Sequence, residues 1–306
     1  MALMPMSPLP QRDGLDAAWI RTPADGPWTT LRDHLIDRIP HLSAERIDAM
    51  FAEGRWCDEQ GEPLPHDAPF IPHRFVWFHR DLPDEVEVPF DIHIVYRDDH
   101  IVVADKPPFL SVIPRGNHVR QSVVVRLRHE LGLPELSPAH RLDRVTSGVV
   151  LLTTHRGVRA PYQQLFEQRR VDKRYHVIAP LDESLRTPRT IESHIVKDRG
   201  VWQAREIDAP ANAATTIQLV ESHQDLGLYT AVPHTGKTHQ IRLHFLRLGL
   251  PIVNDPLYPN VTVTALDDFS RPLQLLAQEL SFTDPLTGEQ RQFQSRRHLH
   301  LPREAA

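Results

Sequence analysis

Residues 90–107, FDIHIVYRDDHIVVADKP, limit the possible fold more than any other stretch of this chain. Two apolar runs rich in β-branched residues are separated only by the polar residues 97–99, and this pattern predicts a β-hairpin. The first two strands of the region are therefore expected to be antiparallel. An antiparallel start argues against a doubly wound parallel sheet.

The segments that follow mix strand and helix patterns without strict alternation. Strand patterns lie at 147–154 and 172–180, and two more at 214–236 surround a turn that contains glycine. Helical patterns lie at 121–132, where a glycine ends the helix, and at 157–170 and 237–249. The sequence thus predicts the α+β class, with a largely antiparallel mixed sheet and helices packed on it.

Charge divides the chain into an acidic and a mildly basic part. Residues 1–90 hold 8 arginines, no lysine and 16 acidic residues, a net charge of −8, whereas residues 91–306 carry +3. Residues 29–56 show two short amphipathic helices, the second with Ser43 as N-cap and apolar Ile47, Met50 and Phe51 at helical spacing. We predict a tail at 1–25, a small α/β module at 26–88, a larger domain at 89–297 and a tail at 298–306.

Two further features bear on the compartment. The chain begins without a basic leader, and no apolar run approaches the roughly 18 residues that cross a bilayer. We expect a cytoplasmic protein with no membrane contact. The single cysteine, Cys57, excludes an intramolecular disulfide, and we interpret it as a buried small apolar residue.

Residues 140–154, HRLDRVTSGVVLLTT, place one carboxylate between two arginines. The guanidinium groups of Arg141 and Arg144 favour the charged form of Asp143, as would hydrogen bonds from the Thr146 and Ser147 hydroxyls. This setting suits a nucleophile or charge stabiliser better than a general acid. The alternative interpretation is a turn aspartate that caps its own backbone.

Five ordered segments together resemble the pseudouridine synthases that act on large-subunit rRNA and tRNA, whose signature reads H-R-L-D-x-x-T-S-G. The resemblance covers roughly residues 90–290. The segments are IVVADKPPFLSVIP at 101–114, HRLDRVTSGVVLLTT at 140–154, DKRYHVIA at 172–179, HTGKTHQIRLHFLRLGLPIVNDPLY at 234–258 and LLAQELSFTDPLTGE at 275–289.

The resemblance implies roles for individual residues. Asp143 matches the catalytic aspartate that attacks the target uridine, so that uracil detaches, turns and is rejoined through carbon. Arg141 matches the arginine that enters the space left by the flipped nucleotide. Tyr175 matches a tyrosine that packs on the uracil and is implicated in proton removal. Arg242 matches the arginine that pairs with the catalytic carboxylate.

The same resemblance implies that the active site works without metal or organic cofactor. Lys106 and Lys237 are expected to contact phosphate, and His140 and His239 to contact the substrate RNA. His239 and His244 have no acidic ligand between them and match helical zinc pairs poorly. The implied fold includes a central RNA-binding cleft.

Residue chemistry is consistent with this activity. The reaction breaks and remakes a bond at an anomeric carbon with no external nucleophile in the product, so one ionised carboxylate is enough. The target base must be extruded, and an aromatic wall such as Tyr175 would stack on it and exclude water. We predict an enzyme that acts as a monomer and isomerises specific uridines in rRNA or tRNA.

Other classes remain open from sequence. A glycoside hydrolase needs two carboxylates about 5 to 10 Å apart, and Asp255 is the available second acid. A non-catalytic RNA-binding protein with the same fold and a metal-dependent nuclease are further alternatives. Residues 31–56 loosely resemble a small RNA-binding domain shared with a ribosomal protein, although the acidity of the module argues against phosphate contact.

Overall fold

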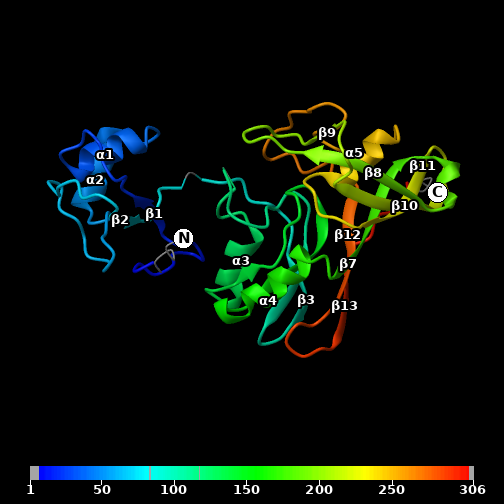
Figure 1. Cartoon of the computed structure of the whole chain (residues 1–306), viewed down its shortest axis with the longest axis horizontal. Helices are drawn as coiled ribbons and strands as arrows, with labels where there is room; N and C mark the ends of the chain where they lie inside the picture. The colour runs from blue at the N-terminus through cyan, green and yellow to red at the C-terminus, as the bar shows by residue number, and fades with distance from the viewer. Residues whose placement is uncertain (1–6, 83, 117, 303–306) are drawn as a thin grey trace. The chain divides into compact units, whose positions relative to one another are not determined.

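The computed structural model describes residues 7–82, 84–116 and 118–302 and divides the chain into two compact units (Figure 1). Unit 1 is Met1–Asp84 and unit 2 is Glu85–Ala306. The boundary predicted near residue 88 lies inside unit 2, because Val88 is buried in its core. The Glu85 carboxylate also accepts hydrogen bonds from the backbone amides of residues 119–121.

Unit 1 combines two helices with a two-stranded antiparallel sheet. Its elements are β1 (Ala18–Arg21), α1 (Leu31–Arg38), α2 (Ala44–Ala52) and β2 (Phe75–Phe78). The pairing of β1 with β2 places Ala18 opposite Phe78 and corrects the predicted tail over 1–25. A strand of four residues is too short to show a period in sequence. Residues 1–6 of that tail and 303–306 of the other lie outside the described residues.

The predicted helices of unit 1 are present with their caps. Ser43 Oγ accepts a hydrogen bond from the Arg46 amide at 3.2 Å, as its N-cap position predicts. The apolar face of α2 is buried in the core of this unit. Cys57 is a buried free thiol, which confirms its interpretation as a packing residue.

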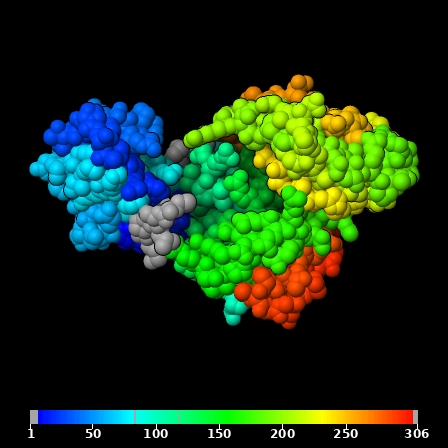
Figure 2. Space-filling view, in the orientation of Figure 1, coloured from blue at the N-terminus to red at the C-terminus, as the bar shows by residue number. Residues whose placement is uncertain are grey.

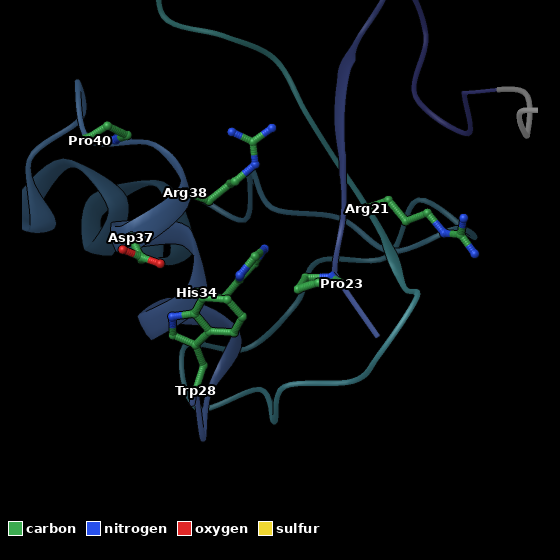
Figure 3. Close-up of a pocket in the computed structure, with 7 residues that line it drawn as sticks. All are labelled: Arg21, Pro23, Trp28, His34, Asp37, Arg38 and Pro40. Carbon is green, nitrogen blue, oxygen red and sulfur yellow. The ribbon is translucent and has the colours of Figure 1, made fainter. Parts of the chain in front are cut away.

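A pocket of about 450 Å³ opens within unit 1. Figure 3 shows the Trp28 indole and His34 imidazole together, with ring centroids 4.5 Å apart and planes at 72°. His34 is 2% exposed, and neither of its ring nitrogens has a hydrogen-bond partner among the described residues. The lining residues are Arg21, Pro23, Trp28, His34, Asp37, Arg38 and Pro40.

Unit 2 is an α+β domain, as predicted, in which the described residues form one sheet of 11 strands (Figure 1). The main path of the sheet runs β3-β4-β6-β12-β7-β11-β10-β8-β9, with β5 on β6 and β13 on β12. The strands are β3 (His93–Arg97), β4 (Ile101–Lys106), β5 (Ser137–Pro138), β6 (Ser147–Thr153), β7 (Val171–Pro180), β8 (Arg189–Val196), β9 (Arg205–Ile207), β10 (Ala213–His223), β11 (Leu226–Pro233), β12 (Leu275–Thr283) and β13 (Gln290–Gln294).

Helices complete unit 2. They are α3 (Val123–Leu131), α4 (Arg156–Glu167), the 3-10 helix η1 (Glu183–Arg186) and α5 (Gln240–Arg247). Gly132 follows α3 in the left-handed conformation with φ 64°, as the predicted glycine cap requires. None of the helices in the described part of the chain is both long and apolar enough to cross a membrane.

The two hairpins that the sequence predicts are present. β3 pairs antiparallel with β4, and β10 with β11. The second turn differs in detail, because it falls at Gln224 and Asp225 and the glycine lies within β11. Gln224 takes φ 53° in that turn.

The parallel contact between β6 and β12 positions the predicted catalytic turn. Ser147 and Gly148 lie opposite Leu276 and Ala277. Gly148 has φ 110°, and a Cβ there would lie 2.2 Å from the Ala277 carbonyl oxygen. Only glycine allows the two backbones to approach this closely. Gly148 of the T-S-G stretch thus allows β6, and the turn before it, to pack directly against β12.

Candidate active site

Asp143 lies in the turn that precedes β6. Its backbone carbonyl accepts a hydrogen bond from the Thr146 amide at 3.1 Å, and its side chain is one-third exposed. Carboxylate oxygen Oδ2 lies 3.3 Å from Arg242 Nη1 and 3.8 Å from His239 Nε2. Among the described residues, no hydrogen-bond or ion-pair partner is found for Oδ1. One oxygen is therefore anchored, and the other is available for chemistry.

The two neighbouring arginines do not supply this anchor, contrary to the expectation from sequence. Arg144 donates to the Phe109 carbonyl at 3.2 Å and lies over the Phe109 ring. Arg141 is exposed. The Ser147 hydroxyl likewise donates to a backbone carbonyl of the β12 region at 3.4 Å. The cation that pairs with Asp143 comes from α5, 99 residues further along the chain.

Arg242 is held between two carboxylates. Its side chain is 1% exposed, and Nε and Nη2 donate to Asp255 at 2.7 and 2.5 Å while Nη1 reaches Asp143. Burial lowers the pKa of the guanidinium, but the hydrogen bond and charge of Asp255 and the charge of Asp143 outweigh burial, and the pKa is raised. This bidentate contact fixes the direction of the third nitrogen toward Asp143.

Asp255 is fully engaged in supporting Arg242. Besides both guanidinium contacts, its Oδ1 accepts backbone amides of Leu257 at 2.8 Å and Tyr258 at 3.1 Å. Its side chain is 1% exposed. A second carboxylate facing the substrate, which the glycoside hydrolase alternative requires, is not available at Asp255. The preceding residue, Asn254, adopts φ 61°, a conformation that asparagine tolerates.

His239 lies beside Asp143 at the start of α5 in a left-handed conformation, with φ 57° and ψ 20°. Its Nδ1 is 2.8 Å from Tyr258 Oη. Tyr258 Oη in turn donates to the Ala204 carbonyl at 2.8 Å and accepts from the Ala204 amide at 2.9 Å. Burial lowers the pKa of the His239 imidazole, although the charge of Asp143 opposes that shift.

Tyr175 is half-buried on β7, where it pairs with Ala231 of β11 and Ala277 of β12. Burial, and then the negative charge of Asp143, raise the pKa of its phenol above the usual range. The electrostatic interaction indicates that Tyr175 lies near Asp143, as the sequence resemblance implies. A phenol in this state is neutral and suited to packing on a base.

Lys106 does not have the surface position expected of a phosphate contact. Lys106 is 0% exposed, and its Nζ donates to the carbonyls of Pro107, Leu110 and Arg144. The predicted phosphate contact is therefore corrected: this lysine links the end of β4 to the turn that contains Asp143.

His140 is also committed to internal contacts. Its Nε2 accepts the Leu151 amide at 3.1 Å, and its ring stacks on Phe166 at 4.3 Å. Burial lowers the pKa of His140 to about 3, so the ring is neutral at pH 7. These contacts connect β6 with α4, and the RNA contact predicted for the partly exposed His140 stays a prediction.

The remaining predicted residues lie as follows. Arg141 and Lys237 are exposed and free to reach an anion in solution. His244 is buried and its Nε2 lies 3.1 Å from Ser193 Oγ, in agreement with its predicted packing role. In the described part of the chain, no cluster of three or more histidine, cysteine or acidic residues could hold a metal ion.

Sequence reasoning missed two supporting residues. Asp255 was considered only as a second catalytic acid, and Tyr258 was not considered. Both belong to the NDPLY stretch at 254–258. An acid followed closely by a tyrosine is the only feature of this stretch that could have marked the two residues as supports of the site. Ala204 binds Tyr258 through its backbone amide and carbonyl, so the identity of its side chain could not have predicted this contact.

The face of unit 2 seen in Figure 2 is hollowed between segments coloured green and yellow-green. A concave surface of this kind is where substrate contacts are usually made. Asp143, Tyr175 and His239 form a small polar centre, in which Oδ1 of Asp143 has no hydrogen-bond partner among the described residues.

Comparison with known proteins points to one family. The family model for RNA pseudouridylate synthase matches residues 100–247. A dual-specificity RNA pseudouridine synthase RluA from Haemophilus ducreyi is 32% identical over 205 residues, which are 64% of this chain and 88% of that protein. The tRNA pseudouridine synthase C of Vibrio parahaemolyticus is 30% identical over 223 residues, 66% of this chain and 89% of the relative.

A solved structure supports the fold. The human RNA pseudouridylate synthase domain containing 4 matches with a TM-score of 0.53 and 24% identity, covering 69% of this chain and 88% of that one.

Proposed function

The chain belongs to the RluA-like family of RNA pseudouridine synthases, which are isomerases, and we propose that it converts specific uridines of rRNA or tRNA to pseudouridine with Asp143 as its single catalytic carboxylate. Relatives named for activity on tRNA and for dual specificity support a structured RNA substrate. The proposal assigns the chemistry to unit 2.

One observation carries the assignment of Asp143. Its Oδ2 is held by the buried Arg242, whereas Oδ1 has no partner among the described residues. Arg242 is itself immobilised by Asp255. A carboxylate anchored through one oxygen presents the other in a defined direction, which is what attack on a bound nucleotide requires.

The proposed chemistry uses this oxygen to form or stabilise the intermediate while uracil is detached from the sugar. The base then turns and is rejoined to the anomeric carbon through C5 instead of N1. Tyr175 packs on the base and keeps water away from the intermediate. Arg242 stabilises the carboxylate when the intermediate breaks down.

RNA binding is assigned to exposed cations near the same turn. Arg141 directly precedes the Leu142–Asp143 pair, and Lys237 lies shortly before α5. Both are exposed and can neutralise phosphates, and we assign to Arg141 the gap left by an extruded nucleotide. Binding through such contacts weakens as salt concentration rises.

The test is Asp143→Asn in the full chain, with Asp267→Asn as an exposed acid-to-amide control in the same unit. We expect pseudouridine formation in single-turnover assays on rRNA and tRNA transcripts to fall roughly 10³-fold or more for Asp143→Asn, because the substitution removes the charged nucleophile while keeping its shape. RNA affinity and the Asp267→Asn rate should stay close to wild type. Near-normal turnover by folded Asp143→Asn would remove the assignment.

A further inference from the structure

Two arginines without an acidic partner line the pocket of unit 1. Arg21 and Arg38 are exposed, and neither forms an ion pair with any described residue. Elsewhere in the same unit, arginines are paired with carboxylates, namely Arg32, Arg46, Arg55 and Arg74. The pocket therefore holds cationic groups that are not neutralised by the protein, although the unit as a whole is acidic.

One acid, Asp37, also lines the pocket. It directly precedes Arg38 in α1, and adjacent residues of a helix do not face each other. In Figure 3 the two side chains leave α1 in different directions. Burial, and then the charge of Arg38, lower the pKa of His34, so that ring is neutral at pH 7. Two arginines and one aspartate leave the lining cationic, and the acidity of unit 1 does not extend to this pocket.

Trp28 forms an aromatic wall of the pocket. Its indole is half-buried, with its centroid 4.5 Å from that of the His34 ring and 5.4 Å from that of Phe70. A Cβ at Gly26 would overlap atoms of the indole, so the glycine backbone lies directly against the ring. These contacts hold the indole in place while part of it stays exposed. Bases of single-stranded nucleic acids stack on aromatic side chains of this kind.

His34 presents hydrogen-bonding groups that the protein does not use. Its side chain is 2% exposed, and neither ring nitrogen has a partner among the described residues. A neutral imidazole has one donor and one acceptor, so both are unused whichever nitrogen carries the proton. Buried polar groups of native proteins nearly always have partners. Figure 3 shows the imidazole between Trp28 and Arg38, where a ligand of the pocket would supply a partner.

The pocket thus combines a stacking surface, a hydrogen-bonding edge and two cations. We propose that it binds one nucleotide, with the base stacked on Trp28 and the phosphate held by Arg21 and Arg38. The His34 imidazole then meets the edge of the base. The volume of about 450 Å³ lies in the range of pockets for small ligands. This site goes beyond the proposed function, because it lies in unit 1 and takes no part in the chemistry at Asp143.

The same chemistry accepts an unpaired nucleotide of an RNA chain or a free nucleotide. The first experiment uses the full chain labelled with 5-fluorotryptophan and fluorine NMR. Substituting Trp28→Phe and Trp19→Phe identifies the two resonances by their loss. The added probes are the monophosphates of the four RNA nucleosides, single-stranded oligouridylate and oligoadenylate, and inorganic phosphate alone.

We expect a nucleotide to shift the Trp28 resonance to a saturating value, because the ring current of a stacked base acts on the indole. The Trp19 resonance should stay in place, since Trp19 is 40% exposed in the same unit but does not line the pocket. A shift with the monophosphates would support a free nucleotide as the ligand. A shift with the oligonucleotides alone would support an unpaired nucleotide of RNA.

Two results would overturn the proposal in this experiment. One is a Trp28 resonance that moves with none of the probes. The other is an equal shift with inorganic phosphate alone, which would identify an anion site without a place for a base.

The second experiment measures affinity by calorimetry for the probe that binds. Trp28→Ala should weaken binding roughly 5- to 150-fold, the range for loss of one stacked base, and Trp19→Ala should leave it unchanged. Arg38→Gln is an exposed substitution that tests the site without removing a packed ring. It should weaken binding, and for an oligonucleotide it should make the slope of log K against log salt less steep by about 0.7. Arg80→Gln, at an exposed arginine outside the pocket lining, is its control.

Turnover enters neither experiment, so this site and the proposed function can fail separately. Asp143→Asn protein should show the same Trp28 shift as wild type. Equal affinities of wild type, folded Trp28→Ala and Arg38→Gln would overturn the nucleotide site even in an active enzyme. Failure of the proposed function would instead appear as wild-type protein that forms no pseudouridine in any transcript tested.

Discussion

Each unit contains an arginine that binds an aspartate through two nitrogens, and the two pairs differ in their surroundings. In unit 1, Arg32 Nε and Nη2 lie 2.5 and 2.9 Å from Asp48, with side chains 27% and 37% exposed. In unit 2, Arg242 contacts Asp255 in the same manner, but each side chain is 1% exposed. The same kind of ion pair is thus exposed to solvent in unit 1 and buried in the protein interior in unit 2.

The difference shows which of the two arginines the protein can hold in one fixed direction. Water screens the exposed pair, and such pairs typically stabilise by less than about 1 kcal/mol. A buried charge cannot exchange its partner for water, so its partners must be supplied by the fold. The Arg242 guanidinium consequently has a fixed orientation, in which Nη1, the nitrogen that does not contact Asp255, donates to Asp143.

Other ion pairs of the acidic unit 1 are also exposed to solvent. Its charges form surface pairs such as Arg46 with Glu53 and Asp81, whose side chains are 34%, 46% and 40% exposed. Its core is formed by apolar side chains around the fully buried Trp56. We therefore expect substitutions in unit 1 to change stability and RNA choice, and those at the buried pair to change chemistry.

The largest effect is expected for Arg242→Met. Removing the guanidinium leaves two carboxylates without their cation, which should destabilise unit 2 by about 3–5 kcal/mol and reduce single-turnover pseudouridine formation by orders of magnitude. Urea unfolding and rapid-quench assays measure the two effects.

The double variant Arg242→Met with Asp255→Asn separates these effects. Neutralising Asp255 keeps an oxygen for the Leu257 and Tyr258 amides, so stability should partly return while activity stays low. Recovery of activity in the double variant would show that Arg242 acts only through stability.

The next effect is expected for Trp56→Ala in unit 1. Trp56 is 0% exposed, packs on Phe78 with centroids 4.6 Å apart, and donates through Nε1 to the Ile47 carbonyl. Truncating it should destabilise unit 1 by about 3–5 kcal/mol. Scanning calorimetry should show a shifted transition for unit 1 beside an unshifted one for unit 2.

Pseudouridine formation on a short stem-loop should persist in the Trp56→Ala protein at temperatures where unit 2 alone is folded. Loss of turnover on every substrate, with unit 2 still folded, would contradict the assignment of chemistry to unit 2.

The smallest effect is expected for Arg32→Ala. The substitution removes the exposed pair with Asp48 and should change the free energy of unfolding far less than Arg242→Met does, and by less still at high salt. Denaturant titrations at low and high ionic strength measure this difference. A loss as large as that of Arg242→Met would remove the distinction between the two pairs.

Local patterns allowed much of this protein to be predicted from sequence. The β3–β4 hairpin, the Ser43 cap and the glycine after α3 depend on residues only a few positions apart, so a short stretch contains the whole signal. The HRLD stretch likewise predicts Asp143 as the catalytic carboxylate. The family resemblance predicts an arginine and a tyrosine beside it, and Arg242 lies within hydrogen-bond distance of Asp143.

Only the tertiary structure decided the partners and the exposure of those residues. Arg242 reaches Asp143 across 99 residues, and Tyr258 binds Ala204 across 54, because strands and loops distant in sequence meet in one sheet. Lys106 resembles a phosphate ligand in sequence, yet the close packing of β4 against the turn that contains Asp143 buries it among three carbonyls. Burial and long-range pairing depend on the whole fold, and they determine which charges face the substrate.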